Sequence, residues 1–232
     1  MMMPTIFEWL ERFSAWRGYP AVAVVLVTAV LVALVWDWRL SIFALMVHYL
    51  FTGLLYVELM PPHMAIVKIL VGLFVCLMLY FTGRQANWGH LPADLTPDET
   101  RSLRPIRMLK IGKFSTPLTA LVRGWLLALA VLFGVLLSQV TALQLPLLPE
   151  ELLFLNTAVW GLLFIGLTSL ALADEPFQAG LGLLLFVSGF ELFYSGLEPA
   201  LSIFAALAIV NFGIVLVLSY LTQIRYLPAT DH

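Results

Sequence analysis

The sequence predicts an all-α protein, a polytopic bundle of about seven transmembrane helices. Hydrophobic residues make up 62% and charged residues 11% of the 232 residues, whereas a soluble domain carries about 25% charged residues. The apolar residues gather in runs of about 20 residues, the length that a helix needs to cross a ~30 Å hydrocarbon core. We therefore expect an integral membrane protein, located in the inner or plasma membrane of a prokaryote.

Seven apolar runs follow one another along the chain, and each is closed by turn-forming or interfacial residues. Trp36 and Trp38 suit the headgroup level at the end of the first run, and Pro61 and Pro62 separate the second run from the third. The runs cover residues 20–36, 40–59, 64–82, 124–143, 152–172, 177–196 and 201–222.

This pattern divides the chain into four segments. Residues 1–18 mix apolar and charged residues at helical spacing, which is typical of an interfacial amphipathic helix; a frayed terminus is the alternative. Residues 19–83 form a three-helix membrane unit, 84–123 a basic loop, and 124–232 a four-helix membrane unit. The start of the chain lacks the features of a secretory signal, so we expect it to remain in the mature protein.

Basic residues concentrate in the 84–123 loop, which holds seven of them against three acidic residues. This excess places the loop in the cytoplasm, and seven spans then put the N-terminus outside and the C-terminus inside. Basic and apolar residues alternate over 106–114, which suits contact with anionic lipid or an acidic partner surface. No Gly-rich phosphate loop accompanies these charges, so we expect no nucleic-acid partner. The basic residues are Arg84, Arg101, Arg104, Arg107, Lys110, Lys113 and Arg123.

A carboxylate within the sixth run, Glu191, is the most informative residue. A charge at the centre of a lipid-embedded helix costs about 2.5–3.5 kcal/mol on insertion scales, so it usually faces the bundle interior or an aqueous path. Ser188, Glu191, Ser195 and Glu198 are spaced by 3, 4 and 3 residues, which places them on one side of a helix. Tyr194 is a further candidate hydrogen-bonding partner.

Three more polar residues lie within apolar runs: His48, Lys68 and Asn211. Lys68 is close to the start of its run, where its long stem could instead carry the ammonium group to the interface. A gapless offset of 143 residues aligns His48 with Glu191 and Lys68 with Asn211. This weak internal similarity would make the two halves of the chain a parallel repeat.

From about residue 152 to residue 221 the chain resembles the small three-helix NuoK-like membrane subunit of complex I, which has relatives in Mrp-type cation/proton antiporters and membrane-bound hydrogenases. The stretches LLFIGLTSLALADEPFQAGLGLLLFVSGFELF and AALAIVNFGIVLVLSYL carry the resemblance. It implies that Glu191 is one of a series of protonatable intramembrane groups. Asn211 stands where a second glutamate is usual, and Asp174 and Glu175 replace a basic pair. Asparagine exchanges no proton, although it can hydrogen-bond a carboxyl group.

The resemblance implies a membrane subunit of an ion-translocating complex. Such a subunit is not catalytic alone; it would be a non-redox part of a proton-translocating oxidoreductase or antiporter, with larger antiporter-like subunits and membrane lipids as partners. The sequence has one cysteine and no HExxH pattern, so we expect no metal and no other cofactor. The candidate proton path comprises Glu191, Asn211, His48 and Lys68, and its supporting polar face comprises Ser188, Ser195, Tyr194 and Glu198.

Two alternatives remain open from the sequence. Glu191 could be a protonated, hydrogen-bonded residue that holds helices together, in a structural or assembly subunit that packs on a larger partner through small residues. The glycines available for such packing are Gly180, Gly182, Gly189 and Gly196. The chain could also be a small stand-alone transporter, although it has few intramembrane charges and no matching pair of interrupted helices.

The charge distribution gives a direct test of topology. A reporter fused near Pro105 should be found in the cytoplasm, and one near Pro146 outside, because the first position lies in the basic loop. Protease protection of the two fusions in intact cells measures this, and the opposite pattern would contradict the seven-span arrangement.

Overall fold

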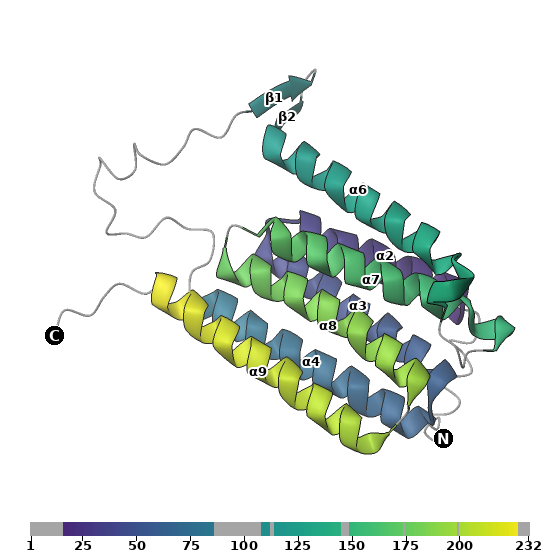
Figure 1. Cartoon of the computed structure of the whole chain (residues 1–232). Helices are drawn as coiled ribbons and strands as arrows, with labels where there is room; N and C mark the ends of the chain where they lie inside the picture. The colour runs from purple at the N-terminus through teal and green to yellow at the C-terminus, as the bar shows by residue number, and fades with distance from the viewer. Residues whose placement is uncertain are drawn as a thin grey trace, which may run out of the picture.

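The computed structural model describes residues 16–85, 108–111, 114–144, 149–173, 175–198 and 200–226. Within these residues the chain forms a bundle of long helices, as Figure 1 shows. Its helices are α2 (Tyr19–Leu34), α3 (Trp38–Leu59), α4 (Pro62–Gln85), α6 (Leu118–Ser138), α7 (Phe154–Ala171), α8 (Pro176–Leu197) and α9 (Leu201–Tyr226).

The predicted all-α membrane bundle is confirmed. Six helices are long and apolar enough to cross a membrane. The seventh, α2, has 16 residues and is about 24 Å long, but Tyr19 at one end and Trp36 beyond the other provide interfacial aromatic groups. The orientation of the bundle, with the N-terminus outside, stays a prediction. Of the predicted interfacial segment 1–18, residues 1–15 lie outside the described part of the chain.

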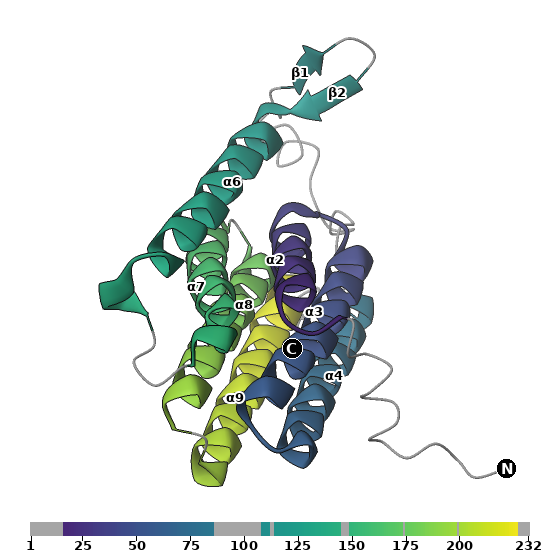
Figure 2. The ribbon, with the colours of Figure 1, turned by 90° about the vertical axis from the view of Figure 1, so that its right-hand side faces the viewer.

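The segment between the two membrane units is shorter than the predicted loop of residues 84–123. Helix α4 continues to Gln85 and α6 already begins at Leu118. The described part of this segment is a two-stranded antiparallel ribbon at the start of α6 (Figure 2), in which β1 (Met108–Ile111) pairs with β2 (Phe114–Pro117). The part of the segment 106–114 that the structure describes is therefore strand, although its basic residues recur every third residue rather than with the period of two that is typical of a strand. Two short 3₁₀ turns, Thr141–Leu143 and Glu150–Leu152, lie between α6 and α7.

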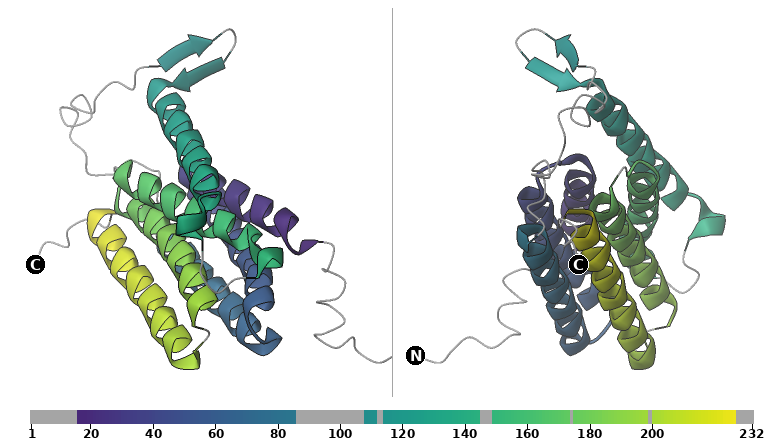
Figure 3. Two further views of the ribbon diagram at one scale, coloured as in Figure 1. Left: turned by 45° about the vertical axis from the view of Figure 1, so that its right-hand side comes forward. Right: turned by 90° about the vertical axis from the view of Figure 1, so that its left-hand side faces the viewer.

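Six of the helices form two triplets, α2–α3–α4 and α7–α8–α9. Each helix of the first triplet contacts the corresponding helix of the second. Contacts join α2 to α7, α3 to α8 and α4 to α9, and Figure 3 shows α4 and α9 side by side. This is the arrangement that a parallel repeat predicts. The register differs, because α8 begins at residue 176 and α3 at residue 38, a spacing of 138 rather than 143 residues.

Glycines bring the backbones of α7 and α8 close together. A Cβ atom on Gly166 would lie 2.6 Å from the Cα of Phe186, and one on Gly182 would lie 2.7 Å from the backbone nitrogen of Leu170. Small residues allow this approach, since apolar side chains gain little by avoiding lipid and close packing must hold helices together. We expected a partner protein to pack against Gly180, Gly182 and Gly189. In the structure these glycines pack against other helices of this chain.

This packing predicts opposite effects for two Gly→Ala substitutions. Gly166→Ala should lower stability by about 1–3 kcal/mol, because its methyl group would overlap the α8 backbone. Gly213→Ala is the matched control, since its Cβ would meet nothing within 4 Å and alanine favours a helix. Thermal unfolding in mild detergent compares the two, and equal stability of both variants would mean that α7 and α8 are not in close contact.

Candidate functional site

The centre of the site is a buried ion pair between Lys68 of α4 and Glu191 of α8. The Nζ atom of Lys68 contacts Oε2 of Glu191, and the two side chains are 5% and 1% exposed. Lys68 is six residues from the start of α4 and Glu191 six from the end of α8, so both lie about 9 Å inside their helices. The alternative that Lys68 reaches the membrane interface is therefore wrong.

Asn211 of α9 completes the pair. Its Nδ2 donates a hydrogen bond of 2.7 Å to Oε1 of Glu191, and its side chain is buried. The two carboxylate oxygens of Glu191 thus contact different helices, and three polar residues link α4, α8 and α9. The sequence predicted each of these residues but did not pair Lys68 with Glu191. The available signal was their opposite charge at a similar depth in two apolar runs.

Two tyrosines of α3 border the ion pair. The ring centroid of Tyr56 lies 6.0 Å from Nζ of Lys68, and Glu191 is close enough to both Tyr49 and Tyr56 to act on them electrostatically. The ring of Tyr49 packs over Gly72, where a Cβ atom would overlap it. The sequence analysis paired neither tyrosine with Glu191, because each resembles any interfacial or core aromatic residue.

The polar face predicted on α8 forms only in part. Ser188 and Ser195 are buried beside Glu191, and the hydroxyl of Ser195 donates a 2.6 Å bond to the Glu191 carbonyl oxygen one turn earlier. Glu198 is exposed and follows the end of the helix. Tyr194 is half-buried and packs against Phe190, with 6.3 Å between ring centroids.

His48 is buried apart from the ion pair. Its Nδ1 lies 3.3 Å from the carbonyl oxygen of Val25 in α2, and its Nε2 lies 3.4 Å from the hydroxyl of Thr52 in α3. The hydrogen bonds described for His48 therefore join α2 to α3, and the structure does not bring this residue to Glu191.

Further polar contacts join α4 and α9 near their C-terminal ends, away from the ion pair. The hydroxyl groups of Thr82 and Ser219 are 2.7 Å apart, and Nε2 of Gln223 donates to Oε1 of Gln85 at 3.0 Å. These contacts hold α4 against α9 on the side opposite to the ion pair. Single hydroxyl and amide residues in apolar runs gave no sequence signal for such pairing.

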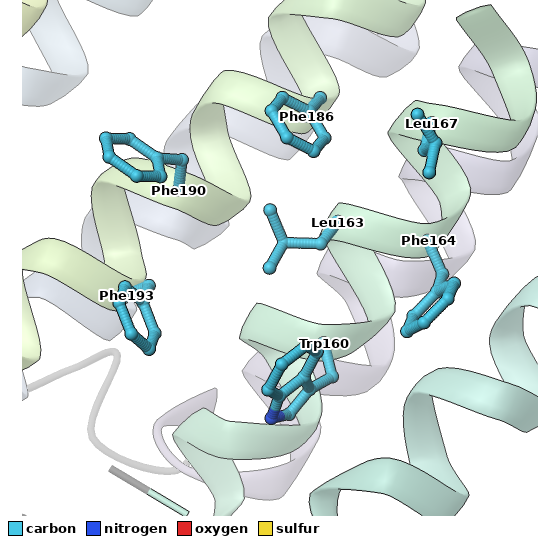
Figure 4. A pocket seen from close by; sticks show the side chains of 7 residues that line it. All are labelled: Trp160, Leu163, Phe164, Leu167, Phe186, Phe190 and Phe193. Carbon is cyan, nitrogen blue, oxygen red and sulfur yellow. The ribbon is translucent and has the colours of Figure 1, made fainter. Parts of the chain in front are cut away.

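An apolar groove of about 330 Å³ lies between α7 and α8 (Figure 4). Its α8 residues, Phe186, Phe190 and Phe193, are on the opposite face of the helix from Ser188 and Glu191, as the helical repeat requires. Trp160, which also lines the groove, donates a hydrogen bond of 3.2 Å from its indole Nε1 to the carbonyl oxygen of Leu143. The groove is thus separate from the polar site. Its lining consists of Trp160, Leu163, Phe164, Leu167, Phe186, Phe190 and Phe193.

Among the described residues, no group of three or more His, Cys, Asp and Glu side chains is placed to hold a metal ion. Comparisons of the chain with protein families, with curated proteins and with solved structures found no match. The chemistry of the site is therefore inferred from its own geometry.

The ion pair predicts a characteristic pattern of stability. Glu191→Gln leaves the Lys68 ammonium group buried without its counter-charge, and breaking a buried pair in this way costs about 3–5 kcal/mol. The double variant Lys68→Met/Glu191→Gln removes both charges and should recover most of that loss. Chemical or thermal unfolding in detergent measures the difference.

The control is the pair of Arg17 and Glu58, whose side chains are 30% and 27% exposed and whose N–O distance is 3.9 Å. Glu58→Gln should cost less than about 1 kcal/mol, because partly exposed pairs contribute little. If Glu191→Gln were as mild as Glu58→Gln, the buried pair would not exist in the membrane.

Proposed function

We propose that this integral membrane protein is a subunit of a complex I-like or Mrp-like ion-translocating complex, and that Lys68 and Glu191 exchange a proton on its way across the membrane. The observation that supports this most is the buried ion pair itself. Ionisable residues inside membrane spans are rare, and they commonly mark proton relays and ion paths. The resemblance of residues 152–221 to the NuoK-like subunits supports the same class.

Proton transfer within the pair changes no net charge. Moving one proton from the Lys68 ammonium group to Glu191 gives a neutral amine and a carboxylic acid, and the reverse step restores the ion pair. Both forms are neutral overall, so neither leaves an uncompensated charge in the low-dielectric interior. From the neutral form, uptake of a proton by the Lys68 amine together with release of the Glu191 proton restores the ion pair, so that one proton crosses the site and no net charge remains.

Asn211 suits both forms of Glu191. In the structure its amide nitrogen donates to the carboxylate, while its Oδ1 is buried and makes no hydrogen bond with the described residues. An amide carries donors on one atom and an acceptor on the other, so a turn of the amide would present Oδ1 to the protonated carboxyl group. Asn211 thus acts as a positioning residue and carries no proton itself.

The partners follow from the same proposal. The Lys68–Glu191 pair supplies one element of a path, so larger antiporter-like subunits would provide the rest, in a prokaryotic inner or plasma membrane. A structural or assembly subunit is the second candidate, favoured by the way that Lys68, Glu191 and Asn211 link three helices of both halves. A small stand-alone transporter is the third.

The proton path predicts that the neutral double variant folds but does not conduct. Lys68→Met/Glu191→Gln keeps the packing and removes both titratable groups, so proton flux should fall at least tenfold. We expect this in membrane vesicles from cells that carry the variant in place of the wild-type chain, measured with a pH-sensitive dye and normalised to assembled protein. Glu191→Gln alone is less suitable, because it also leaves the buried Lys68 ammonium group without its counter-charge.

Two control variants should keep the wild-type flux: Glu58→Gln, at a partly exposed pair, and His48→Gln, whose hydrogen bonds remain within α2 and α3. Wild-type flux in the double variant would remove the relay role and favour the structural subunit. Purification of the full chain in mild detergent separates the candidates further, since a homogeneous homo-oligomer would favour the stand-alone transporter.

A further inference from the structure

We propose that Arg39 and Arg84 bind the phosphate group of an anionic phospholipid, at the end of the bundle where α3 begins and α4 ends. Trp38 connects the two arginines, and an exposed apolar stripe on α4 receives an acyl chain of the same lipid. This lipid site lies apart from the Lys68–Glu191 pair and does not depend on the proposed function.

Trp38 brings the two arginines to one place. It is the first residue of α3, and its ring packs on the end of α4, where a Cβ atom on Gly83 would lie 2.7 Å from the ring and the Tyr80 ring centroid is 5.7 Å away. Arg84 follows Gly83 directly and stands one turn beyond Tyr80, so it lies on the Tyr80 side of α4. The guanidinium carbon of Arg39 lies 5.2 Å from the centroid of the Trp38 ring. Both arginines are therefore neighbours of one indole ring.

The charge of this patch is only partly balanced by the protein. Arg39 and Arg84 are exposed, and neither belongs to an ion pair with another described residue. The acidic residue beside them in the sequence, Asp37, caps α3, since its Oδ1 accepts a 2.9 Å hydrogen bond from the backbone nitrogen of Arg39. Two positive charges against one negative charge leave the patch with a net charge of +1, which an anionic ligand complements.

The stacking of Arg39 on Trp38 suits a phosphate ligand. The distance is within the ~6 Å over which a cation is attracted to an aromatic face. A guanidinium group that stacks in this way keeps its N–H groups in the ring plane, where they form a fork that matches two oxygens of a phosphate. Because the ring already orients the guanidinium group, less conformational freedom is lost when a ligand binds.

A second arginine–tryptophan pair at the same end of the bundle is engaged within the protein. The guanidinium carbon of Arg123 lies 5.6 Å from the centroid of the Trp36 ring. However, Arg123 is only 6% exposed, and its Nη1 donates a 3.1 Å hydrogen bond to Oε1 of Gln178. Arg123 therefore holds α6 to α8, whereas Arg39 and Arg84 face outward.

The position in the membrane selects a lipid among anionic ligands. Trp38 and Tyr80 stand near the ends of spanning helices, at the level where aromatic residues meet the headgroups. From Arg84 toward the middle of the membrane, exposed apolar residues continue along one face of α4 at intervals of three and four residues. This stripe is about 21 Å long, more than the ~15 Å that half of the hydrocarbon core measures. It consists of Phe81, Leu77, Phe74 and Leu70, which are 50%, 48%, 55% and 48% exposed.

The test is lipid binding to the full chain in mild detergent, measured by native mass spectrometry. Phosphatidylglycerol is compared with phosphatidylcholine that has the same acyl chains, and the wild type should bind the anionic lipid more tightly. Arg39→Gln and Arg84→Gln should each weaken phosphatidylglycerol binding about fivefold, the contribution of one basic residue at an anionic lipid surface. Both variants should leave phosphatidylcholine binding unchanged, and both should fold, because the two side chains are exposed.

The matched control is Arg17→Gln, which removes the same charge from the opposite end of the bundle, where Arg17 contacts Glu58. It should bind phosphatidylglycerol as the wild type does. Equal binding of the two lipids by the wild type, or an unchanged phosphatidylglycerol affinity in either Arg39→Gln or Arg84→Gln, would overturn the proposal. Displacement of bound phosphatidylglycerol by excess inorganic phosphate would also overturn it, because the patch would then be a site for free anions and the stripe on α4 would contribute nothing.

Discussion

The buried ion pair of Lys68 and Glu191 constrains the arrangement of this bundle. Neither Lys68 nor Glu191 is acceptable alone in a low-dielectric interior, because an unpaired buried charge costs several kcal/mol. Together they require α4 and α8, which are far apart in the sequence, to keep one relative position. Asn211 adds α9 to the same contact. The pair is therefore a structural constraint and the chemical centre at once, and the positions of the surrounding side chains follow from it.

The other helix contacts are of two kinds: close apolar packing between α7 and α8, and polar contacts between α4 and α9. Glycines bring α7 and α8 into backbone contact, and such an interface has little room for water or movement. Helices α4 and α9 instead meet through polar side chains, the hydroxyls of Thr82 and Ser219 and the amides of Gln85 and Gln223, while Asn211, nearer the middle of α9, bonds to Glu191 of α8. The close packing of α7 against α8 holds Glu191 in place. The polar side chains of α4 and α9 leave the carboxylate oxygens of Glu191 accessible to other polar groups.

Much of the fold followed from periodicity and run length, whereas the site followed only in part. Six of the seven apolar runs matched the helices to within a few residues, because a ~30 Å core sets their length. The fourth run, expected at 124–143, is displaced, since α6 spans Leu118–Ser138. Glu191 and Ser195 share one helix face, so spacing sufficed to group them. The partnership of Glu191 with Lys68 depends on how helices 123 residues apart meet, which no local pattern encodes. Tyr49 was missed for the same reason. The strand pair was missed because its strands have only four residues each and the basic segment was interpreted as a membrane-surface contact.

The central claim is that the Lys68 ammonium group contacts the Glu191 carboxylate inside the membrane. The most direct measurement is solid-state NMR dipolar recoupling between lysine Nζ and glutamate Cδ in lipid bilayers, which is tractable because the chain has only three lysines. We expect one strong coupling, corresponding to a separation of about 4 Å or less, that disappears in Lys68→Met. Absence of this coupling in the wild type, or its persistence in Lys68→Met, would contradict the account.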